Sequence, residues 1–242
     1  MKIVLVNDDG PFSTGVTKLR ELLEKEGFET YVFVPHQEMS ASSHALTLSK
    51  PLHVKEIEKN YFIVDGTPAD CAYVAMFYFL KDMKIDYVIS GINRGYNMGE
   101  DVFYSGTVAG AMEGFFHKVN GIAVSAKDFS NIDNVATHFV NFFKTLSAKK
   151  IKKPFLLNIN YPEGDIKGIK FTSLSSRLYP GNIVECVDPR GVKSYWIGGV
   201  PAVWNGEKDS DINAVKEGYV SVTPIKADIT DRDFLQELKS IF

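Results

Sequence analysis

The stretch IVLVNDDGP, residues 3–11, joins a short apolar run to two adjacent acids and a glycine. An uninterrupted apolar run of this kind is typical of a strand that is buried on both faces of a parallel sheet. Asp-Gly is also a strong turn pair, so NDDG can be interpreted as a simple turn. A hairpin turn would lead into an alternating strand after Gly10, whereas a loop and an amphipathic helix follow. The two acids therefore belong to a strand-to-helix connection.

The composition is that of an ordinary soluble globular protein, with 45% hydrophobic and 24% charged residues over 242 positions. A net charge of -3 argues against binding of a nucleic-acid polymer, which needs concentrated positive charge. The two cysteines, Cys71 and Cys186, have no spacing that suits zinc or a disulfide framework. The start of the chain lacks the pattern of a signal peptide, and the apolar run from Cys71 to Leu80 is too short to span a bilayer. We therefore expect a cytoplasmic protein without membrane association.

Strand-like and helix-like segments alternate through the first two-thirds of the chain. After the first strand, residues 15–26 place apolar residues at helical spacing and end at Gly27. Three short strands are expected as an antiparallel excursion at 45–49, 52–57 and 61–65. Further strands are expected at 30–35, 85–90, 121–126 and 154–160. Helices are expected at 106–117 and 132–146, and another helix is expected to begin at a capping box formed by Thr67 and Asp70. This alternation predicts an α/β fold with a three-layer, Rossmann-like, mainly parallel sheet flanked by helices.

From about residue 168 the pattern changes to antiparallel strands. They are expected at 171–175, 182–188, 193–199 and 218–224, with a hairpin turn at Asp188–Gly191. A last helix is expected from Thr230, with Asp233 at the capping-box spacing. The hairpin region is richer in aromatic residues than a compact core needs, which favours a lid or an arm around another subunit: Tyr179, Tyr195, Trp196 and Trp204.

The two acids of the opening stretch fall at the carboxyl edge of the predicted sheet, where ligands bind in open parallel sheets. A turn explains Gly10, but it does not explain two adjacent carboxylates beside helix N-termini. Hard oxygen ligands suit Mg²⁺, Mn²⁺ or Ca²⁺. We interpret Asp8 and Asp9 as ligands of one divalent metal ion, with the simple turn as the alternative.

Three further loops are predicted at the same edge. EMSASSH, residues 38–44, supplies serines and a histidine, and SGINRGYNMG, residues 90–99, supplies asparagines among glycines. The helix after Tyr104 begins at Ser105, and backbone amides at a helix N-terminus bind anions. Each feature also has a purely structural interpretation, such as a serine helix cap or asparagines in turns. Their coincidence at one edge favours a metal beside an anion site.

A divalent metal beside an anion site indicates a phosphate substrate. Neither a GxxxxGK[ST] loop nor a DxDx[TV] motif occurs in the chain. The residues therefore favour metal-assisted hydrolysis of a phosphomonoester by water. Attack by Asp8 to form a phosphoenzyme is the alternative route. Two other functions stay open, namely a nucleoside hydrolase and a non-catalytic nucleotide-binding module.

Several motifs together resemble the SurE family of survival proteins: NDDG, EMSASSH, GTPADC, SGINRGYNMGEDVFYSGTVAGAMEG and EGYVSVTP. They extend from Lys2 to about Pro224, so the resemblance covers nearly the whole chain. It implies a 5′/3′-nucleotidase that hydrolyses nucleoside monophosphates, with activity on short polyphosphate in some members. It also implies one Mg²⁺ or Mn²⁺ ion per subunit, with Ca²⁺ as a substitute in crystals, and a homodimer or homotetramer formed through the C-terminal arm.

The resemblance assigns roles to individual residues. It implies Asp8, Asp9, Ser40 and Asn93 as metal ligands. It implies a pocket for the substrate and its phosphate lined by Asn7, His44, Asn97, Ser105, Gly106 and Thr107, with Asp8, Asp9, Asn97 and Ser105 as the catalytic set. Ser43 and Tyr96 depart from the family pattern, since glycine is common at the first position and a smaller residue or proline at the second. We divide the chain into a metal- and phosphate-binding core, residues 1–165, and an oligomerisation arm, residues 166–242, of the same domain.

Overall fold

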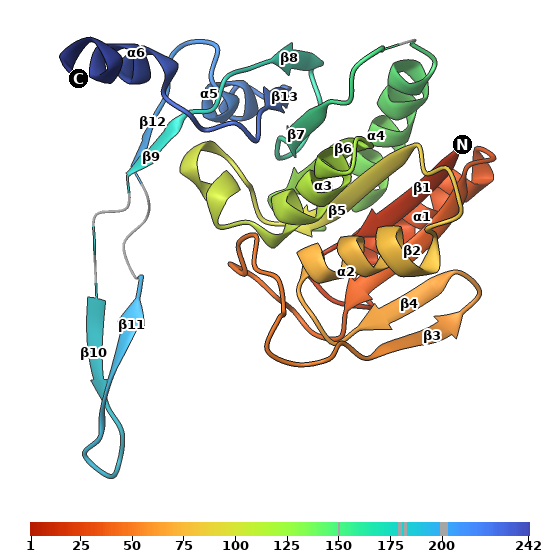
Figure 1. Cartoon of the computed structure of the whole chain (residues 1–242), viewed down its shortest axis with the longest axis horizontal. Coiled ribbons are helices and arrows are strands. Elements are labelled where there is room, and N and C mark those ends of the chain that lie inside the picture. Colours follow the sequence, from red (N-terminus) through yellow and green to blue (C-terminus); the bar gives the residue numbers. More distant parts are fainter. Residues whose placement is uncertain (150, 179–180, 182, 199–202) are drawn as a thin grey trace.

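Nine of the described strands form one mixed sheet, in the order β3-β4-β2-β1-β5-β6-β7-β13-β8 (Figure 1). The computed structural model describes residues 1–149, 151–178, 181, 183–198 and 203–242. The strands of the sheet are β1 (Lys2–Val6), β2 (Glu29–Pro35), β3 (Val54–Glu58), β4 (Tyr61–Val64), β5 (Tyr87–Arg94), β6 (Asn120–Ala126), β7 (Leu156–Tyr161), β8 (Ile169–Phe171) and β13 (Val220–Ile225). All pairs from β4 to β7 are parallel, which confirms the predicted mainly parallel sheet.

Helices cover both faces of the sheet and complete the predicted three layers (Figure 1). One face carries α1 (Thr14–Lys25) and α4 (Ile132–Ser147). The other carries α3 (Gly106–Phe116) and α2 (Pro68–Val74), which continues into a π-helical turn at Ala75–Phe79. The capping box expected at Thr67 and Asp70 is present. A 3₁₀ turn at Gly99–Phe103 precedes α3, and α5 (Asp211–Lys216) and α6 (Arg232–Ile241) follow in the C-terminal part.

The side chains of β1 alternate between the two helical layers. Ile3 and Leu5 belong to the apolar core under α1 and α4, whereas Val4 and Val6 belong to the core under α2. All four side chains are fully buried. Because successive side chains of a strand point to opposite faces, this alternation also sets the directions available to the residues that follow Val6.

α3 lies unusually close to the sheet because its contact face consists of glycines. A methyl group added at Gly110 would lie 3.0 Å from Val6, and one added at Gly114 would lie 2.5 Å from Val88. These two glycines therefore serve the packing of the helix against the sheet. Close packing brings the first turn of α3 directly against the end of β1.

Three details of the predicted elements were wrong. Residues 45–49 form no strand, and β4 runs parallel to β2, so only β3 is antiparallel there. Most of 171–175 lies between β8 and β9 (Ser176–Leu178) instead of forming a strand, and β8 pairs parallel with β13. The N-cap of α6 is Asp231 instead of Thr230, because the Asp231 carboxylate accepts the Phe234 amide at 2.9 Å.

The hairpin arm projects away from the body of the molecule (Figure 1). Strands β10 (Ile183–Val187) and β11 (Lys193–Ile197) pair antiparallel across the predicted Asp188–Gly191 turn, where the Gly191 amide donates to Asp188 O at 3.0 Å. Tyr195 and Trp196 lie on β11, whereas Trp204 lies on β12 (Val203–Asn205), which pairs with β9 near the body. Tyr179 lies outside the described residues. β8 and β13 belong to the predicted arm, residues 166–242, and both join the main sheet. The division of the chain between residues 165 and 166 stays a prediction.

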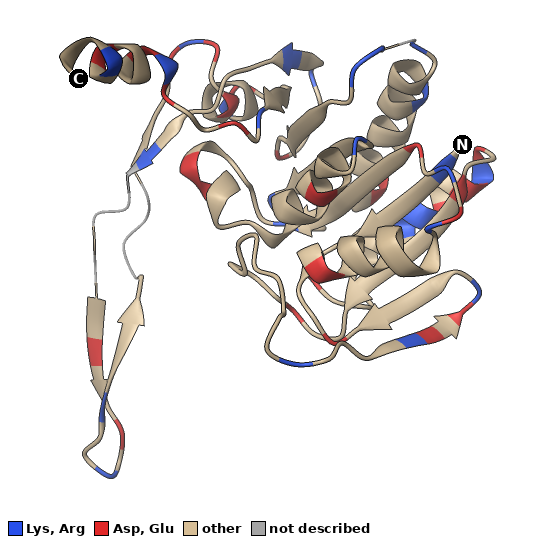
Figure 2. Cartoon of the chain, viewed as in Figure 1, with Lys and Arg blue, Asp and Glu red and all other residues tan. Residues whose placement is uncertain are grey.

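Lysine, arginine and acidic residues are distributed over many elements rather than gathered on one (Figure 2). This distribution agrees with the small net charge of -3. Within the described part of the chain, no helix is long and apolar enough to cross a membrane.

Candidate active site

The NDDG stretch forms a tight turn at the end of β1. The Asn7 side-chain amide donates to Gly10 O at 2.7 Å, and Gly10 has a φ of 93°, a conformation that favours glycine. The turn interpretation is thus correct locally, and the same turn presents both acids. Asn7 itself is fully buried, and its Oδ1 has no hydrogen-bond partner among the described residues.

Asp8 points toward α3 and is 5% exposed. The hydroxyl of Thr107, which is fully buried in the first turn of α3, donates to Asp8 Oδ1 at 2.6 Å. The pKa of Asp8 is raised to about 6, chiefly by burial; the Thr107 hydrogen bond opposes the shift and the neighbouring charge of Asp9 adds to it. A carboxylate in this position gains from a nearby cation.

Asp9 points toward α1, the opposite side, and is partly exposed. Its Oδ2 accepts the Ser13 hydroxyl at 3.4 Å and the Arg94 backbone amide at 3.3 Å. Burial raises the pKa of Asp9, and the charge of Glu38 adds to the shift. Asp8 therefore contacts the start of α3, and Asp9 contacts the start of α1 and the end of β5.

The loop of residues 38–44 folds over the end of β1. The Met39 amide donates to Asp8 O at 2.8 Å, and the Ser43 amide donates to Tyr104 O at 2.9 Å. Ser43 has a φ of 52°, which explains why glycine suits this position. Ser40, predicted as a metal ligand, directs its hydroxyl to Glu38 Oε1 at 2.8 Å. Ser40 is the donor in this hydrogen bond, so the lone pairs of its oxygen stay available to a cation.

The first turn of α3 meets Asp8 closely. A methyl group added at Gly106 would lie 3.2 Å from Asp8 Cβ and 2.6 Å from Ser42 Oγ, so only glycine fits there without a shift. Ser105 is the N-cap, and its Oγ accepts the Val108 amide at 3.0 Å, as the helix-cap interpretation expects. The amides of Gly106 and Thr107 lie in the first turn of α3, where backbone N–H groups have no intrahelical acceptor, and this arrangement favours an anion.

β5 continues further than predicted and carries Asn93 to its end. The Asn93 side-chain amide donates to Gly95 O at 2.9 Å, which leaves its Oδ1 as the oxygen that can face a cation. Asn97 lies one strand away, where its side-chain amide donates to Ser125 Oγ at 2.9 Å. The backbone of Asn97 is held by the side chains of Asn158 and Asn160.

His44 is the predicted site residue that the structure does not bring to the acids. Its Nε2 lies 2.5 Å from Glu113 Oε1, and its ring stacks on Phe116 with a centroid separation of 5.3 Å. Glu113 is seven residues beyond Gly106 on α3, a rise of about 10 Å along the helix. Glu113 also contacts His117, so this buried carboxylate anchors the loop against the far end of α3.

The donors at the sheet edge fit a hard divalent cation. Asp8, Asp9, Ser40 and Asn93 offer oxygen atoms only, and neither acid forms an ion pair with a described residue. No cluster of three or more His, Cys, Asp or Glu side chains suited to a metal occurs in the described ranges. A cation here would therefore be held by two carboxylates and neutral oxygens.

Sequence reasoning missed several residues that shape this edge. Ser13, Glu38 and Ser125 contact predicted site residues directly. Asn158 and Asn160 carried a usable signal, since two asparagines at i and i+2 in the apolar strand LLNINY must share one face. Ser13 and Glu38 have no comparable signal, because their partners are close only in the folded chain.

Comparisons with known proteins identify the family of the chain. Residues 3–180 match the model of the family described as "Survival protein SurE". The "5'-nucleotidase SurE" of Anaeromyxobacter dehalogenans (strain 2CP-C) is 42% identical, over 99% of this chain and 95% of that protein. That of Aquifex aeolicus (strain VF5) is 40% identical, over 98% and 96%. A crystal structure of the Aquifex aeolicus SurE protein superposes with a TM-score of 0.86 at 39% identity, over 100% and 99% of the two chains. The chain belongs to the SurE family.

Proposed function

We propose that the protein is a metal-dependent phosphohydrolase that releases phosphate from nucleoside 5′- or 3′-monophosphates. The observation that carries this proposal is the 2.6 Å hydrogen bond between Thr107 and Asp8, because it joins an anion-favouring helix start to an acid suited to a metal. The name 5′-nucleotidase carried by the relatives supports the same reaction. A cytoplasmic location fits the two cysteines, which are both free thiols.

Asp8, Asp9, Ser40 and Asn93 would hold one Mg²⁺ or Mn²⁺ ion. When bound, such an ion supplies a Lewis acid for a phosphoryl oxygen and makes a bound water a better nucleophile. Thr107 fixes the direction of the Asp8 carboxylate, and Ser13 does the same for Asp9. These two hydrogen bonds hold the acids in place before substrate arrives.

The first turn of α3 would bind the phosphate of the substrate. The amides of Gly106 and Thr107 and the positive end of the helix stabilise negative charge on the phosphoryl oxygens. Gly106 lets this turn pack closely against Asp8 and Ser42, and Ser105 keeps the turn in shape by capping the helix. Asn97 would contribute from the neighbouring loop, where four hydrogen bonds fix its position.

The test is phosphate release from a panel of nucleoside 5′- and 3′-monophosphates and tripolyphosphate, with Mg²⁺, Mn²⁺ or EDTA. We expect turnover that requires metal and that falls to background in Asp9→Ala. Release of free base instead of phosphate would establish a nucleoside hydrolase. Metal-dependent binding by folded protein without any turnover would establish a non-catalytic module, and labelled phosphate on Asp8 after acid quench would replace water attack by a phosphoenzyme route.

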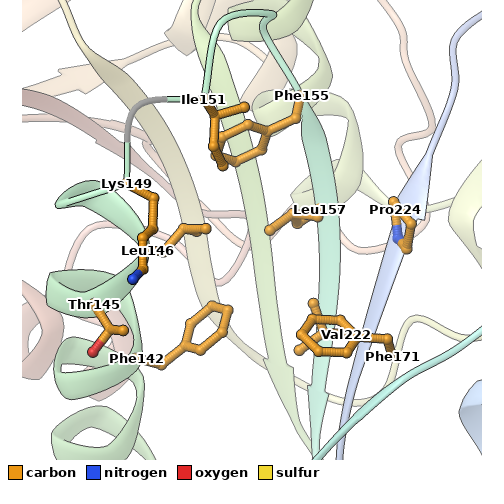
Figure 3. Close-up of a pocket in the computed structure, with 10 residues that line it drawn as sticks. All are labelled: Phe142, Thr145, Leu146, Lys149, Ile151, Phe155, Leu157, Phe171, Val222 and Pro224. Carbon is orange, nitrogen blue, oxygen red and sulfur yellow. The ribbon is translucent and has the colours of Figure 1, made fainter.

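We also propose that the C-terminal arm joins subunits into a homodimer or homotetramer. β11 exposes 69% of Trp196 and 92% of Ile197, and no residue of α6 is buried. Elsewhere on the body, Phe142, Leu146, Phe155, Phe171 and Pro224 line an apolar hollow of about 420 Å³ (Figure 3). Burial of exposed apolar surface of this kind favours association.

Light scattering after size-exclusion chromatography tests the assembly. We expect an oligomer for the wild type, and smaller species for Trp196→Glu and for a chain that ends before Arg232. Tyr78→Glu, which changes an exposed aromatic residue of the body, is the matched control and should leave the mass unchanged. A monomeric wild type, or arm variants of unchanged mass, would contradict this proposal.

A further inference from the structure

A hollow of about 400 Å³ opens beside Asp9, on the side of the sheet edge that faces α1. Its walls carry two aromatic rings, one cation and two acids: Asp9, Phe12, Ser13, Glu38, Arg94 and Phe129. A second hollow of similar size, lined by Tyr96, Met98 and Trp204, contains neither Asp8 nor Asp9. Of these two hollows, the one beside Asp9 is therefore the one that one of the two acids lines.

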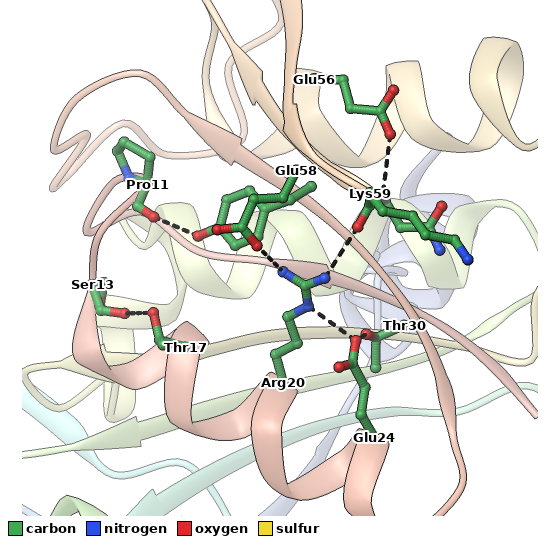
Figure 4. Close-up of polar contacts among 11 residues, drawn as sticks. Pro11, Ser13, Thr17, Arg20, Glu24, Thr30, Glu56, Glu58 and Lys59 are labelled. Atoms are coloured by element: carbon green, nitrogen blue, oxygen red, sulfur yellow. Dashed lines mark hydrogen bonds and ion pairs between the residues drawn. The ribbon is translucent and has the colours of Figure 1, made fainter.

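Among the residues that line this hollow, Phe12 is unusual because this large apolar residue is 82% exposed. Its neighbours on both sides are fixed. The Tyr61 hydroxyl donates to Pro11 O, and Ser13 caps α1 by accepting the Gly15 amide at 3.3 Å. Figure 4 shows the hydrogen bond to Pro11 O and, at the start of α1, the Thr17 hydroxyl donating to Ser13 O. A phenylalanine on a rigid backbone with an open ring face adds little to the core and is suited to stacking on a flat ligand.

The two sides of the sheet edge differ in the space that they offer. On the side of Asp8, the first turn of α3 is enclosed, since a methyl group at Gly106 would lie within 3 Å of both Ser42 and Pro68. On the side of Asp9, the hollow is open. An ester group attached to a phosphate at the start of α3 would find open space on the side of Asp9, where this hollow lies.

The charges of the hollow suit a sugar and a base. Arg94 forms no ion pair with any residue in the described ranges, so its guanidinium can donate to a ligand. The Glu38 carboxylate is exposed and can accept from hydroxyl or amino groups. Phe129 packs against Gly15 at the floor of the hollow, where a methyl group at Gly15 would lie 3.2 Å from its ring.

We propose that this hollow binds the nucleoside part of the substrate and that Phe12 stacks on the base. This inference rests on the proposed function and adds the position and the recognition of the leaving group. Phe12 acts on substrates that carry a base and is indifferent to esters that lack one. Stacking of a base on an aromatic ring changes affinity by roughly 5- to 100-fold.

The test compares AMP with ribose 5-phosphate, which shares the phosphate and sugar but lacks the base. We expect Phe12→Ala to lower kcat/KM for AMP roughly tenfold and to leave that for ribose 5-phosphate within twofold. Phe12→Tyr should restore AMP turnover, and Tyr78→Ala, which removes an exposed ring far from the site, should change neither substrate. Binding of adenosine, measured by calorimetry with Mg²⁺ present, should weaken by the same factor in Phe12→Ala.

Equal losses for both substrates would overturn the proposal, because Phe12 would then act only through the shape of its loop. Unchanged AMP turnover and unchanged adenosine binding in Phe12→Ala would also overturn it. Absence of phosphate release from both substrates by the wild type would reject the proposed phosphohydrolase instead. In that case adenosine binding alone decides whether the hollow holds a nucleoside.

Discussion

Asp8 and Asp9 are adjacent in the chain but lie in different surroundings. Asp8 is enclosed against α3, accepts a hydrogen bond of 2.6 Å from a buried threonine and is 5% exposed. Asp9 faces an open hollow and accepts longer hydrogen bonds of 3.3 and 3.4 Å from the Arg94 amide and Ser13. The difference follows from the strand, because successive side chains after Val6 alternate between the layers of α3 and α1.

This comparison shows how one strand end can divide two tasks. The enclosed side offers the backbone amides of a helix start, which suit a small anion such as phosphate. The open side offers space, two aromatic rings and a cation, which suit a larger group attached to that anion. A cation between the two acids would stand where the two sides meet.

The largest expected effect concerns the acids themselves. Asp8→Asn and Asp9→Asn should each lower kcat by about 100-fold or more, because each removes one of the two carboxylates that we propose hold the ion. Steady-state phosphate release with saturating Mg²⁺ measures this loss, and circular dichroism checks that both variants fold. If either variant kept more than a tenth of wild-type activity, that acid would not be a ligand.

The stability of the metal-free protein should separate the two acids. Asp8→Asn replaces an enclosed charge by a neutral group of the same shape, so we expect the free energy of unfolding to rise by about 1–3 kcal/mol. Asp9→Asn removes a partly hydrated charge and should raise it less. Urea unfolding in EDTA gives both values. An equal rise in the free energy of unfolding for both variants would contradict the stronger desolvation of the Asp8 carboxylate.

Addition of metal should stabilise the wild type and not the two Asn variants. A ligand that binds only the folded protein adds about 2.7 kcal/mol at a hundredfold excess over Kd. Mg²⁺ should therefore raise the Tm of the wild type and leave both Asn variants nearly unchanged. A rise of equal size in Asp9→Asn would show that the ion is held without that carboxylate.

Loss of the hydroxyl group that donates to each acid should have a smaller effect than loss of the acid itself, and the two hydroxyl groups should differ in which property they change. Thr107→Val keeps the shape but leaves Asp8 Oδ1 without its donor, and we expect roughly a tenfold loss of kcat/KM. Ser13→Ala removes a longer hydrogen bond to Asp9 and the cap of α1, so its main effect should be a loss of about 1 kcal/mol of stability. Kinetics and urea unfolding on the same preparations compare the two, and the opposite pattern would contradict the tighter coupling on the side of Asp8.

The smallest expected effect concerns Tyr61, which holds the backbone before Phe12 on the side of Asp9. Arg20 lies over the Tyr61 ring and contacts Glu24, Glu58 and Lys59 O (Figure 4). Tyr61→Phe removes the donor to Pro11 O and should cost about 0.5–1.5 kcal/mol in urea unfolding. Tyr87→Phe is a matched control, since the Tyr87 hydroxyl has no hydrogen bond to a described residue, and it should change stability less.

Much of the fold was predictable because its signals are local. Apolar runs located the parallel strands, helical spacing located α1 and α4, and the capping box at Thr67 marked the start of α2. The weaker predictions concern short segments, where residues 45–49 and 172–175 are not strands. There the partner decides the structure, as when β8 pairs with β13 about 50 residues further along the chain.

The sequence by itself determined which chemical groups stand at the carboxyl edge, because a strand followed by a helix places its last residues there whatever the rest of the chain does. Only the tertiary structure decided what each group touches. It turned Ser40 to Glu38, anchored His44 on Glu113 and bound Asn97 to Ser125. It also enclosed Asp8 and left Asp9 beside a hollow. The physical reason is that side-chain direction is set by neighbouring residues in the strand, whereas partners and open space depend on elements far apart in sequence.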